Sequence, residues 1–274
     1  MLVAVSGYRA VGVVGLGRMG LTLAAGFSKA VGPEGVFAAG RSPASVTRLR
    51  AAVPGATVLP LPDLPGRADV IVLCVGNADL PSVLDDLRPG LGLRHVVVAI
   101  NNGLPLRALA EAVDGPVAKL IPSAGNEAGA GATLLVPGAR LTEQGTRDLL
   151  ALLRAFSTPF VIEEAQGRAA TDLASCGPAL LAAAARAMVD AQQERGAPLP
   201  RELAEQLVAQ SLQAAGRLLA EGAGLDDVVQ RVAVPGGNTA AALTAARDGL
   251  TTAWHAAFRA TAANERSRPA PAFR

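Results

Sequence analysis

The sequence contains almost no lysine and few aromatic residues. Lysine and arginine together number 25 among 274 residues, yet only Lys29 and Lys119 are lysines, and aromatic residues make up 3%. Acidic residues number 23, so the formal net charge is only +2 and offers little attraction to a polyanion. Few aromatic rings are present to stack on bases. We therefore expect no nucleic-acid partner.

Cysteine is also sparse, and long apolar runs are missing. Cys74 and Cys176 form no CxxC pair and no cluster with histidine that could hold a metal ion. Residues 1–8 lack the basic start and apolar centre of a signal peptide. The longest uncharged stretch, Val232 to Ala246, is broken by Pro235 and two glycines, which makes it a poor membrane span. We expect a cytoplasmic protein with no metal and no membrane partner.

The composition that is present is that of a folded protein with two parts. Half of the residues are apolar and 18% are charged, which excludes a disordered chain. Short apolar runs alternate with helix-like segments as far as Glu163, and only helical patterns follow. We predict one domain over residues 1–163 and a second over residues 164–274.

The sequence of residues 1–163 predicts a sheet covered by helices. Its apolar runs are continuous rather than alternating, as in parallel strands that are buried on both faces. The predicted strands are Val11–Val14, Val36–Ala39, Val70–Val75, His95–Ile100, Val117–Ile121 and Ala132–Val136. The predicted helices of this part are Met19–Ala30, Ala44–Val53, Leu106–Val113 and Glu143–Phe156.

The second part reads as helices alone. Alanine occupies several faces of these helices, and their apolar stripes are too broad for one subunit to bury. We therefore expect a homodimer, or a higher homo-oligomer, built on this part, and a frayed tail over Ser267–Arg274. The predicted helices are Pro178–Arg195, Arg201–Glu221, Leu225–Ala233 and Thr239–Arg266.

A glycine motif follows the first predicted strand. Gly15, Gly17 and Gly20 form GxGxxG at the start of a helix, where they permit a tight turn, close approach of a pyrophosphate and close helix packing. The motif predicts a Rossmann-like, doubly wound parallel α/β sheet that binds a dinucleotide. The predicted cofactor-binding residues here are Gly15, Leu16, Gly17, Arg18, Met19 and Gly20.

The end of the second predicted strand indicates which dinucleotide is bound. An NAD site usually carries Asp or Glu there for the ribose 2′-hydroxyl, whereas this sequence has Arg41 and Ser42. An arginine can pair with the 2′-phosphate of NADPH, and a serine can donate to it. We expect NADPH as the cofactor. The alternative is that Arg41 is one of many solvated surface arginines.

Two segments of the helical part carry a family resemblance. Residues 174–179, ASCGPA, resemble the SGSGPA segment of the pyrroline-5-carboxylate reductases, and residues 234–239, VPGGNT, resemble that family's SPGGTT segment. The dehydrogenases of 6-phosphogluconate and 3-hydroxyisobutyrate share GLGxMG but use a lysine in the helical domain, and residues 120–274 contain none. The resemblance to the reductases extends from Val11 to about Arg266.

The resemblance implies NADPH-dependent reduction of a cyclic imine by hydride transfer. It implies a Rossmann domain followed by an all-helical dimerisation domain, as in the conversion of pyrroline-5-carboxylate to proline. The family's pattern gives Thr239 the catalytic role of bonding the substrate nitrogen. The substrate-binding residues that the resemblance implies are Cys176, Gly236, Gly237, Asn238 and Thr239.

Physical chemistry independently favours anion binding at the second of these segments. A Pro-Gly-Gly turn that leads into a helix exposes unpaired N–H groups at the positive end of the helix dipole, which suits a carboxylate. A plain N-cap turn between helices would have the same sequence pattern. We expect His95 and His255 to be structural residues and not catalytic acids or bases.

The departures from the family concentrate near the expected nicotinamide and substrate. Val75, Gly76 and Asn77, predicted to contact the cofactor, stand where the family has Lys-Pro, and residues 119–125 replace its RxMPNTP-like segment. Cys176 replaces a serine. The expected pocket is roomier and more apolar, so the substrate is pyrroline-5-carboxylate or a related imine of specialised metabolism. A non-catalytic NADP-binding or regulatory paralogue, and an NADP-linked carbonyl reductase, are the alternatives.

Overall fold

A computed structural model describes residues 7–267 of the chain. These residues divide into two compact units, of which one is Ala179–Asn264 and the other is made by the chain on both sides of that segment. The strands end near Glu163, but the helix that follows belongs to the first unit. Of the predicted frayed tail Ser267–Arg274, residues 268–274 lie outside the described residues.

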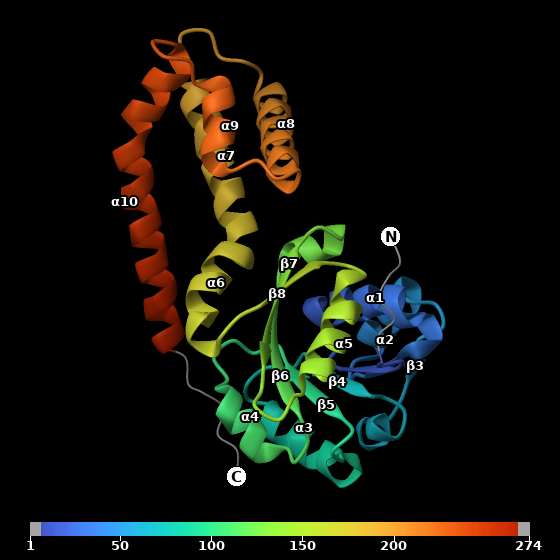
Figure 1. Ribbon diagram of the computed structural model, residues 1–274. Coiled ribbons are helices and arrows are strands. Elements are labelled where there is room, and N and C mark those ends of the chain that lie inside the picture. The colour runs from blue at the N-terminus through green and yellow to red at the C-terminus, as the bar shows by residue number, and fades with distance from the viewer. Residues whose placement is uncertain (1–6, 268–274) are drawn as a thin grey trace. The chain divides into compact units, whose positions relative to one another are not determined.

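The first unit is built on a single eight-stranded sheet in the order β3-β2-β1-β4-β5-β6-β7-β8 (Figure 1). Neighbouring strands are parallel except for β6 and β7, which are antiparallel. The predicted α/β fold is therefore confirmed, with one correction, since the sheet is not parallel throughout. The strands are β1 Val11–Val14, β2 Val36–Ala39, β3 Thr57–Val58, β4 Val70–Leu73, β5 Val96–Ala99, β6 Val117–Pro122, β7 Ala132–Pro137 and β8 Thr158–Val161.

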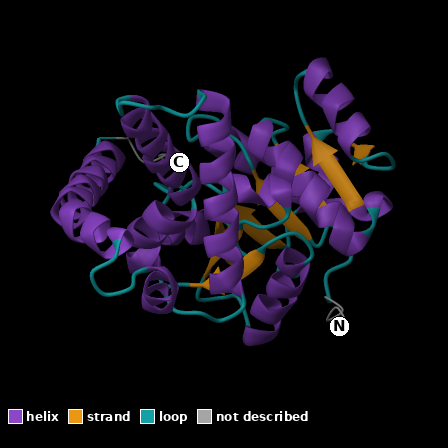
Figure 2. Ribbon diagram, turned by 90° about the horizontal axis from the view of Figure 1, so that it is seen from above, coloured by secondary structure: helices purple, strands orange, loops and turns teal. Residues whose placement is uncertain are grey.

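Helices cover both faces of this sheet (Figure 2). In β4 the side chains of Val70 and Val72 join the core cluster that holds α1 and α5, whereas Ile71 and Leu73 join the cluster that holds α3 and α4. This alternation is why the strand sequences are continuously apolar. The helices of the first unit are α1 Arg18–Val31, α2 Pro43–Ala52, α3 Leu80–Leu87, α4 Leu106–Ala112, α5 Glu143–Arg154 and α6 Gly167–Ala174.

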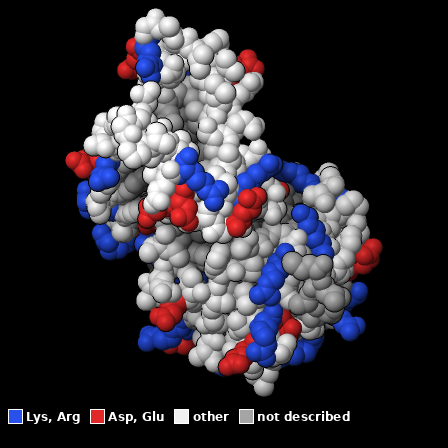
Figure 3. Space-filling model, turned by 45° about the horizontal axis from the view of Figure 1, so that its top comes forward, with Lys and Arg blue, Asp and Glu red and all other residues white. Residues whose placement is uncertain are grey.

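The second unit consists of helices with little core of their own. Among its residues, all of which the structure describes, only Val189 and Ala204 are buried hydrophobic residues. Large apolar side chains are exposed on every helix, and the surface shown for this unit in Figure 3 is mostly uncharged. Such a surface needs a partner to cover it. The helices are α7 Gly177–Gln193, α8 Arg201–Ala220, α9 Leu225–Val232 and α10 Asn238–Arg266, of which α7 begins and α10 ends in the first unit.

One helical stretch in residues 7–267 is long and apolar enough to cross a membrane by length and composition alone. It is Glu164–Gln193, which comprises α6 and α7, and 11% of its most apolar window is buried in the structure. One such stretch is weak evidence for a membrane span. The same exposed apolar character is expected of a helix that meets another subunit.

Candidate cofactor and substrate sites

The three glycines after β1 meet three different steric requirements. Gly15 has φ +90°, and a Cβ there would lie 2.7 Å from the Cys74 carbonyl oxygen. At Gly20 a Cβ would lie 1.9 Å from the carbonyl oxygen of Gly15, so only glycine permits α1 to start this close to the strand. Gly17 has open space where its Cβ would be, with no atom within 4 Å. The turn and the helix are therefore fixed by packing, while space is left at Gly17 for a pyrophosphate.

A cleft of about 700 Å³ opens over these glycines at the carboxyl ends of β1, β2 and β4. Its volume lies within the range of small-molecule sites, and it straddles β1 and β4, where the strand order reverses. The residues present therefore fit a dinucleotide. Predicted cofactor residues that line the cleft are Gly15, Leu16, Gly17, Arg41, Ser42, Val75 and Gly76.

The remaining predicted cofactor residues lie beside the cleft. The side chain of Arg18 turns to Glu127, with 2.9 Å between Nε and Oε1, and this hydrogen bond lowers the pKa of the Glu127 carboxyl. Met19 packs against the core beneath the loop. Asn77 accepts a hydrogen bond of 2.8 Å from Asn101. These side chains support the loops around the cleft.

The cleft contains polar residues that sequence reasoning missed. Ser45 and Arg48 line it from α2, at positions that follow Ser42 by three and six residues. Their helical spacing to Ser42 was the available signal, because residues three apart share a helix face. Arg41 is 89% exposed and lies 3.2 Å from Asp79, which also lines the cleft. The lining thus holds two arginines and two serines at or just after the end of β2, where a 2′-phosphate is expected, and the carboxylates of Asp79 and Asp86 line the same cleft.

A buried cation lies elsewhere in the first unit, on β6. The Lys119 side chain is 5% exposed, and its Nζ lies 2.8 Å from Glu164 Oε1. The same Oε1 accepts a 2.7 Å hydrogen bond from the Leu106 backbone N–H. Partial burial raises the pKa of Glu164, but the bonds from Lys119 and Leu106 outweigh it and the pKa is lowered overall. One carboxylate therefore satisfies both the lysine and the start of α4.

Cys176, the predicted substrate-binding residue of the first unit, follows the end of α6. Its Sγ lies 3.7 Å from Nη2 of Arg168, and Arg168 is paired with Asp172 at 2.7 Å. The neighbouring Ser175 hydroxyl donates to the Pro122 carbonyl at the end of β6, over 3.1 Å. The segment is thus attached to the carboxyl end of β6. Because β1, β4, β5 and β6 are parallel, this is the edge of the sheet that also carries the cofactor loops after β1 and β4.

The predicted substrate turn lies in the second unit, between α9 and α10. Gly236 has φ +75°, and the Gly237 N–H donates to the Val234 carbonyl over 3.0 Å. Asn238 begins α10, and Thr239 is half-buried in its first turn. The turn therefore presents the start of a 29-residue helix, as the sequence predicted. Cys176 and Thr239 belong to different units.

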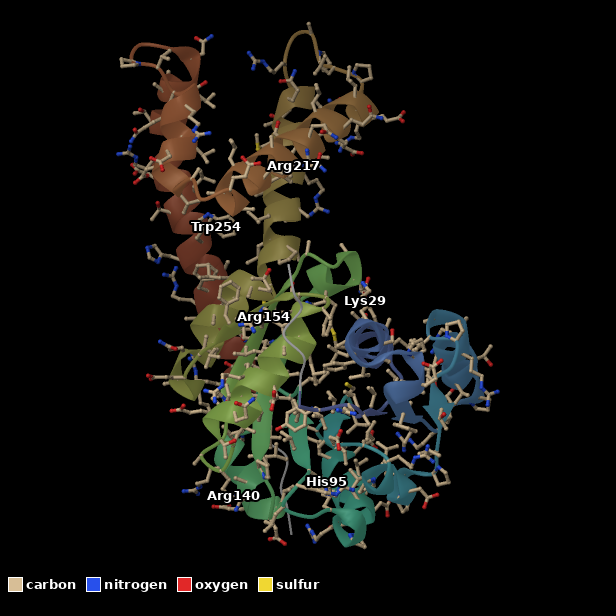
Figure 4. All side chains as sticks on the ribbon, turned by 45° about the vertical axis from the view of Figure 1, so that its right-hand side comes forward. Lys29, His95, Arg140, Arg154, Arg217 and Trp254 are labelled. Atoms are coloured by element: carbon tan, nitrogen blue, oxygen red, sulfur yellow. The ribbon has the colours of Figure 1, made fainter. Side chains whose placement is uncertain are left out.

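The two histidines and Cys74 offer no acid–base group to the cleft. His95 is buried, its Nδ1 accepts from the Gly92 N–H, and its Nε2 lies 2.9 Å from the Pro65 carbonyl (Figure 4). Because both ring nitrogens are engaged, His95 ties together the loops around β5. His255 is exposed on α10. Burial raises the pKa of Cys74 to about 12, so this thiol stays protonated at neutral pH.

Two family models match different parts of the chain. Residues 164–268 match the dimerisation region of pyrroline-5-carboxylate reductase, and residues 10–103 match a model described as NADP oxidoreductase, coenzyme F420-dependent. The pyrroline-5-carboxylate reductase of Escherichia coli is 27% identical over 84% of this chain and 86% of its own length. These matches support a divergent member of the pyrroline-5-carboxylate reductase family.

Further similarity extends over almost the whole chain. ComE operon protein 4 of Bacillus subtilis is 28% identical over 92% of this chain and 93% of its own. A Plasmodium falciparum pyrroline carboxylate reductase, solved with NADP bound, superposes with a TM-score of 0.78 at 21% identity, over 94% of this chain and 97% of that one. At that identity the likeness supports the fold. The chain thus joins a region similar to NADP oxidoreductases to a region that matches the dimerisation region of pyrroline-5-carboxylate reductase.

Proposed function

We propose that this protein reduces a cyclic imine with NADPH, the imine being pyrroline-5-carboxylate or a related compound. The observation that carries the proposal is the intact cradle of Gly15, Gly17 and Gly20 in a chain whose helical region matches the reductase family. The NADP that accompanies one structural relative supports the same cofactor. When bound, the reduced nicotinamide supplies the hydride.

Different residues of the cleft hold different parts of this cofactor. The backbone around Gly17 faces the pyrophosphate at the start of α1, where unpaired N–H groups and the helix dipole favour anions. Arg41 and Arg48 are placed to pair with the 2′-phosphate, with Ser42 and Ser45 beside them. Val75 and Gly76 line the cleft on the β4 side, toward the expected nicotinamide.

The turn before α10 carries groups that suit the substrate. The N–H groups of Gly237 and Asn238 suit a carboxylate, and the Thr239 hydroxyl can bond the ring nitrogen. An iminium already carries the positive charge that activates it for hydride attack, so the protein needs only to orient the ring, exclude water and admit a proton. This is consistent with a cleft that contains no histidine among its lining residues.

We propose that the active form is a homodimer, or a larger homo-oligomer, in the cytoplasm. The support is the family's dimerisation region over residues 164–268 and the exposed apolar side chains of α7 to α10. Leu181, Met188, Leu207 and Leu225 are each at least half exposed. Pairing with a second copy would cover them.

A panel of imines tests the proposed activity. NADPH oxidation is followed at fixed protein concentration with pyrroline-5-carboxylate, piperideine carboxylates and bulkier cyclic imines, and with ketones as a carbonyl control. We expect turnover of at least one imine and none of the ketones. The Thr239→Val variant should lose most of that turnover while its NADPH affinity is unchanged. Turnover of ketones alone would replace the proposal with the carbonyl reductase.

A non-catalytic role is the second candidate function. One relative that spans 92% of the chain is named ComE operon protein 4, a name that states no reaction. Residues 75–77 and 119–125, which differ from the family's segments, favour the same role. This reading expects tight NADPH binding without hydride transfer to any imine in the panel. The same assay therefore separates the two functions.

A further inference from the structure

Asn101 joins the loops that follow two neighbouring strands. It lies just after β5, and its Nδ2 donates to the Val75 carbonyl oxygen over 3.0 Å and to Asn77 Oδ1 over 2.8 Å. Val75 and Asn77 belong to the loop after β4, which pairs with β5 in the sheet. One half-buried amide thus closes the gap between the two strand ends.

The orientation of this amide follows from its partners. A backbone carbonyl oxygen can only accept, so the Asn101 atom that faces Val75 must be the donor nitrogen. The other side-chain atom, Oδ1, is buried and has no hydrogen-bond partner among the described residues. A buried acceptor without a partner disfavours the folded state. Stability alone is therefore a poor reason for an asparagine here, and its two donated bonds need another explanation.

The loop that Asn101 holds lies on the nicotinamide side of the cleft. The glycine loop after β1 and Arg41 after β2 take the pyrophosphate and the 2′-phosphate, so a dinucleotide that crosses the switch point extends over β4. Val75 and Gly76 line the cleft at that point. A Cβ built on Gly76 would have no atom within 4 Å, so the space on that side of the loop is open.

We propose that Asn101 is a positioning residue that fixes the loop Val75–Asn77 for the nicotinamide half of the cofactor. The family carries a proline in this loop, whose ring restricts the backbone, and here a side-chain hydrogen bond to Asn77 supplies the restraint. The proposal rests on the proposed function, because it requires NADPH in the cleft. Asn101 acts through the loop and is not itself a catalytic residue.

The test compares two ligands that share the adenosine half. Direct binding of NADPH and of adenosine 2′,5′-bisphosphate, which lacks nicotinamide, is measured by calorimetry for the wild type and for Asn101→Ala and Asn101→Asp. We expect both variants to lose about tenfold in NADPH affinity, on the order of two hydrogen bonds, with adenosine 2′,5′-bisphosphate affinity kept within about twofold. Asn102→Ala is the matched control, because the Asn102 amide bonds Glu265 instead of the loop, over 2.6 Å.

A proline at position 77 should restore the NADPH affinity that is lost with the Asn101 side chain. Asn77 is the second residue of a turn that the Asp79 N–H closes onto the Gly76 carbonyl over 3.1 Å, a position that proline favours. The double variant Asn77→Pro/Asn101→Ala should therefore regain most of the lost NADPH affinity. Unchanged NADPH affinity in both single variants would overturn the positioning role of Asn101 and leave the proposed function standing. A wild-type protein that binds no NADPH would overturn the proposed function as well.

Discussion

Gly17 and Gly20 are a pair of residues whose identical substitution should have opposite consequences. A Cβ at Gly17 meets no atom of the chain, so Gly17→Ala should keep the melting temperature but lose about tenfold or more in NADPH affinity by obstructing the pyrophosphate. Gly20→Ala places a Cβ 1.9 Å from the Gly15 carbonyl oxygen and should cost about 1–3 kcal/mol of unfolding free energy. Thermal melts and NADPH titrations of the two variants check this.

Gly66→Ala is the matched control for the glycine pair. A Cβ at Gly66 also meets no atom within 4 Å, and Gly66 does not line the cofactor cleft. We expect wild-type binding and stability from this variant. Equal NADPH affinity for Gly17→Ala and Gly66→Ala would contradict the assignment of the pyrophosphate to Gly17.

Arg41 should decide between NADPH and NADH. Removing a charge-assisted bond to the 2′-phosphate in Arg41→Ala should weaken NADPH binding about tenfold to a hundredfold and leave NADH binding almost unchanged. Arg50→Ala, an exposed arginine of α2 outside the cleft, serves as the control. Equal losses for NADPH and NADH would refute the role. Arg41 Nη2 lies 3.2 Å from Asp79 Oδ2, and this acidic neighbour keeps the guanidinium near the cleft.

Sequence reasoning identified single residues best where backbone geometry demanded them. The glycine motif was recognised because steric limits at Gly15 and Gly20 leave no other residue type. Asn101 carries no such signal, since asparagine is common on loops and its partners Val75 and Asn77 are distant from it in the sequence. Conversely, the mere presence of Arg41 indicated a phosphate site without indicating Asp79.

At the scale of elements, Glu164 connects three parts of the first unit. Its carboxylate bonds Lys119 of β6 and the first residue of α4, and it lies just after β8. Glu164→Gln should cost about 1–3 kcal/mol of unfolding free energy, because it leaves the Lys119 charge buried without a counterion. Lys119→Met should cost less, since the half-exposed carboxylate can then be hydrated. Urea unfolding at pH 7 compares the two variants.

The contribution of Glu164 should also depend on pH in a defined direction. Its pKa in the folded protein lies below the ordinary value of 4.5, so the stabilisation is complete above pH 4.5 and is lost as the pH falls through the lowered value. The difference between wild type and Glu164→Gln should therefore shrink in acid. A difference that stays constant down to pH 3 would show that the carboxylate charge is unimportant.

Whole elements were predictable where burial imposes a pattern. Strands β1, β2, β4 and β5 are buried on both faces, and continuous apolar runs in their sequences indicate this burial. The edge strand β8 was missed because Phe160 and Val161 are about half exposed and no buried run marks them. β3 has two residues, too few for any period. The antiparallel direction of β7 depends on the path of the connection after β6, which periodicity does not report.

At the scale of the whole molecule, the helical unit should fold only with a partner. Two buried hydrophobic residues cannot offset the ordering of residues 179–264, so apolar surface must be covered by a second subunit. The melting temperature followed by helical circular dichroism should therefore rise with protein concentration. Sedimentation over the same range should report a dimer or larger species. A monomeric mass together with a concentration-independent melt would contradict this.

The burial of Lys119 leaves the protein with a single accessible side-chain amine. Lys29 is exposed at the end of α1 (Figure 4). Lys119 is buried beside Glu164, and the sequence contains no other lysine. Amine-reactive dyes, crosslinkers and biosensor surfaces should therefore attach at Lys29, besides the α-amine of the chain. With the α-amine blocked, each subunit would then be immobilised through Lys29 in one defined orientation.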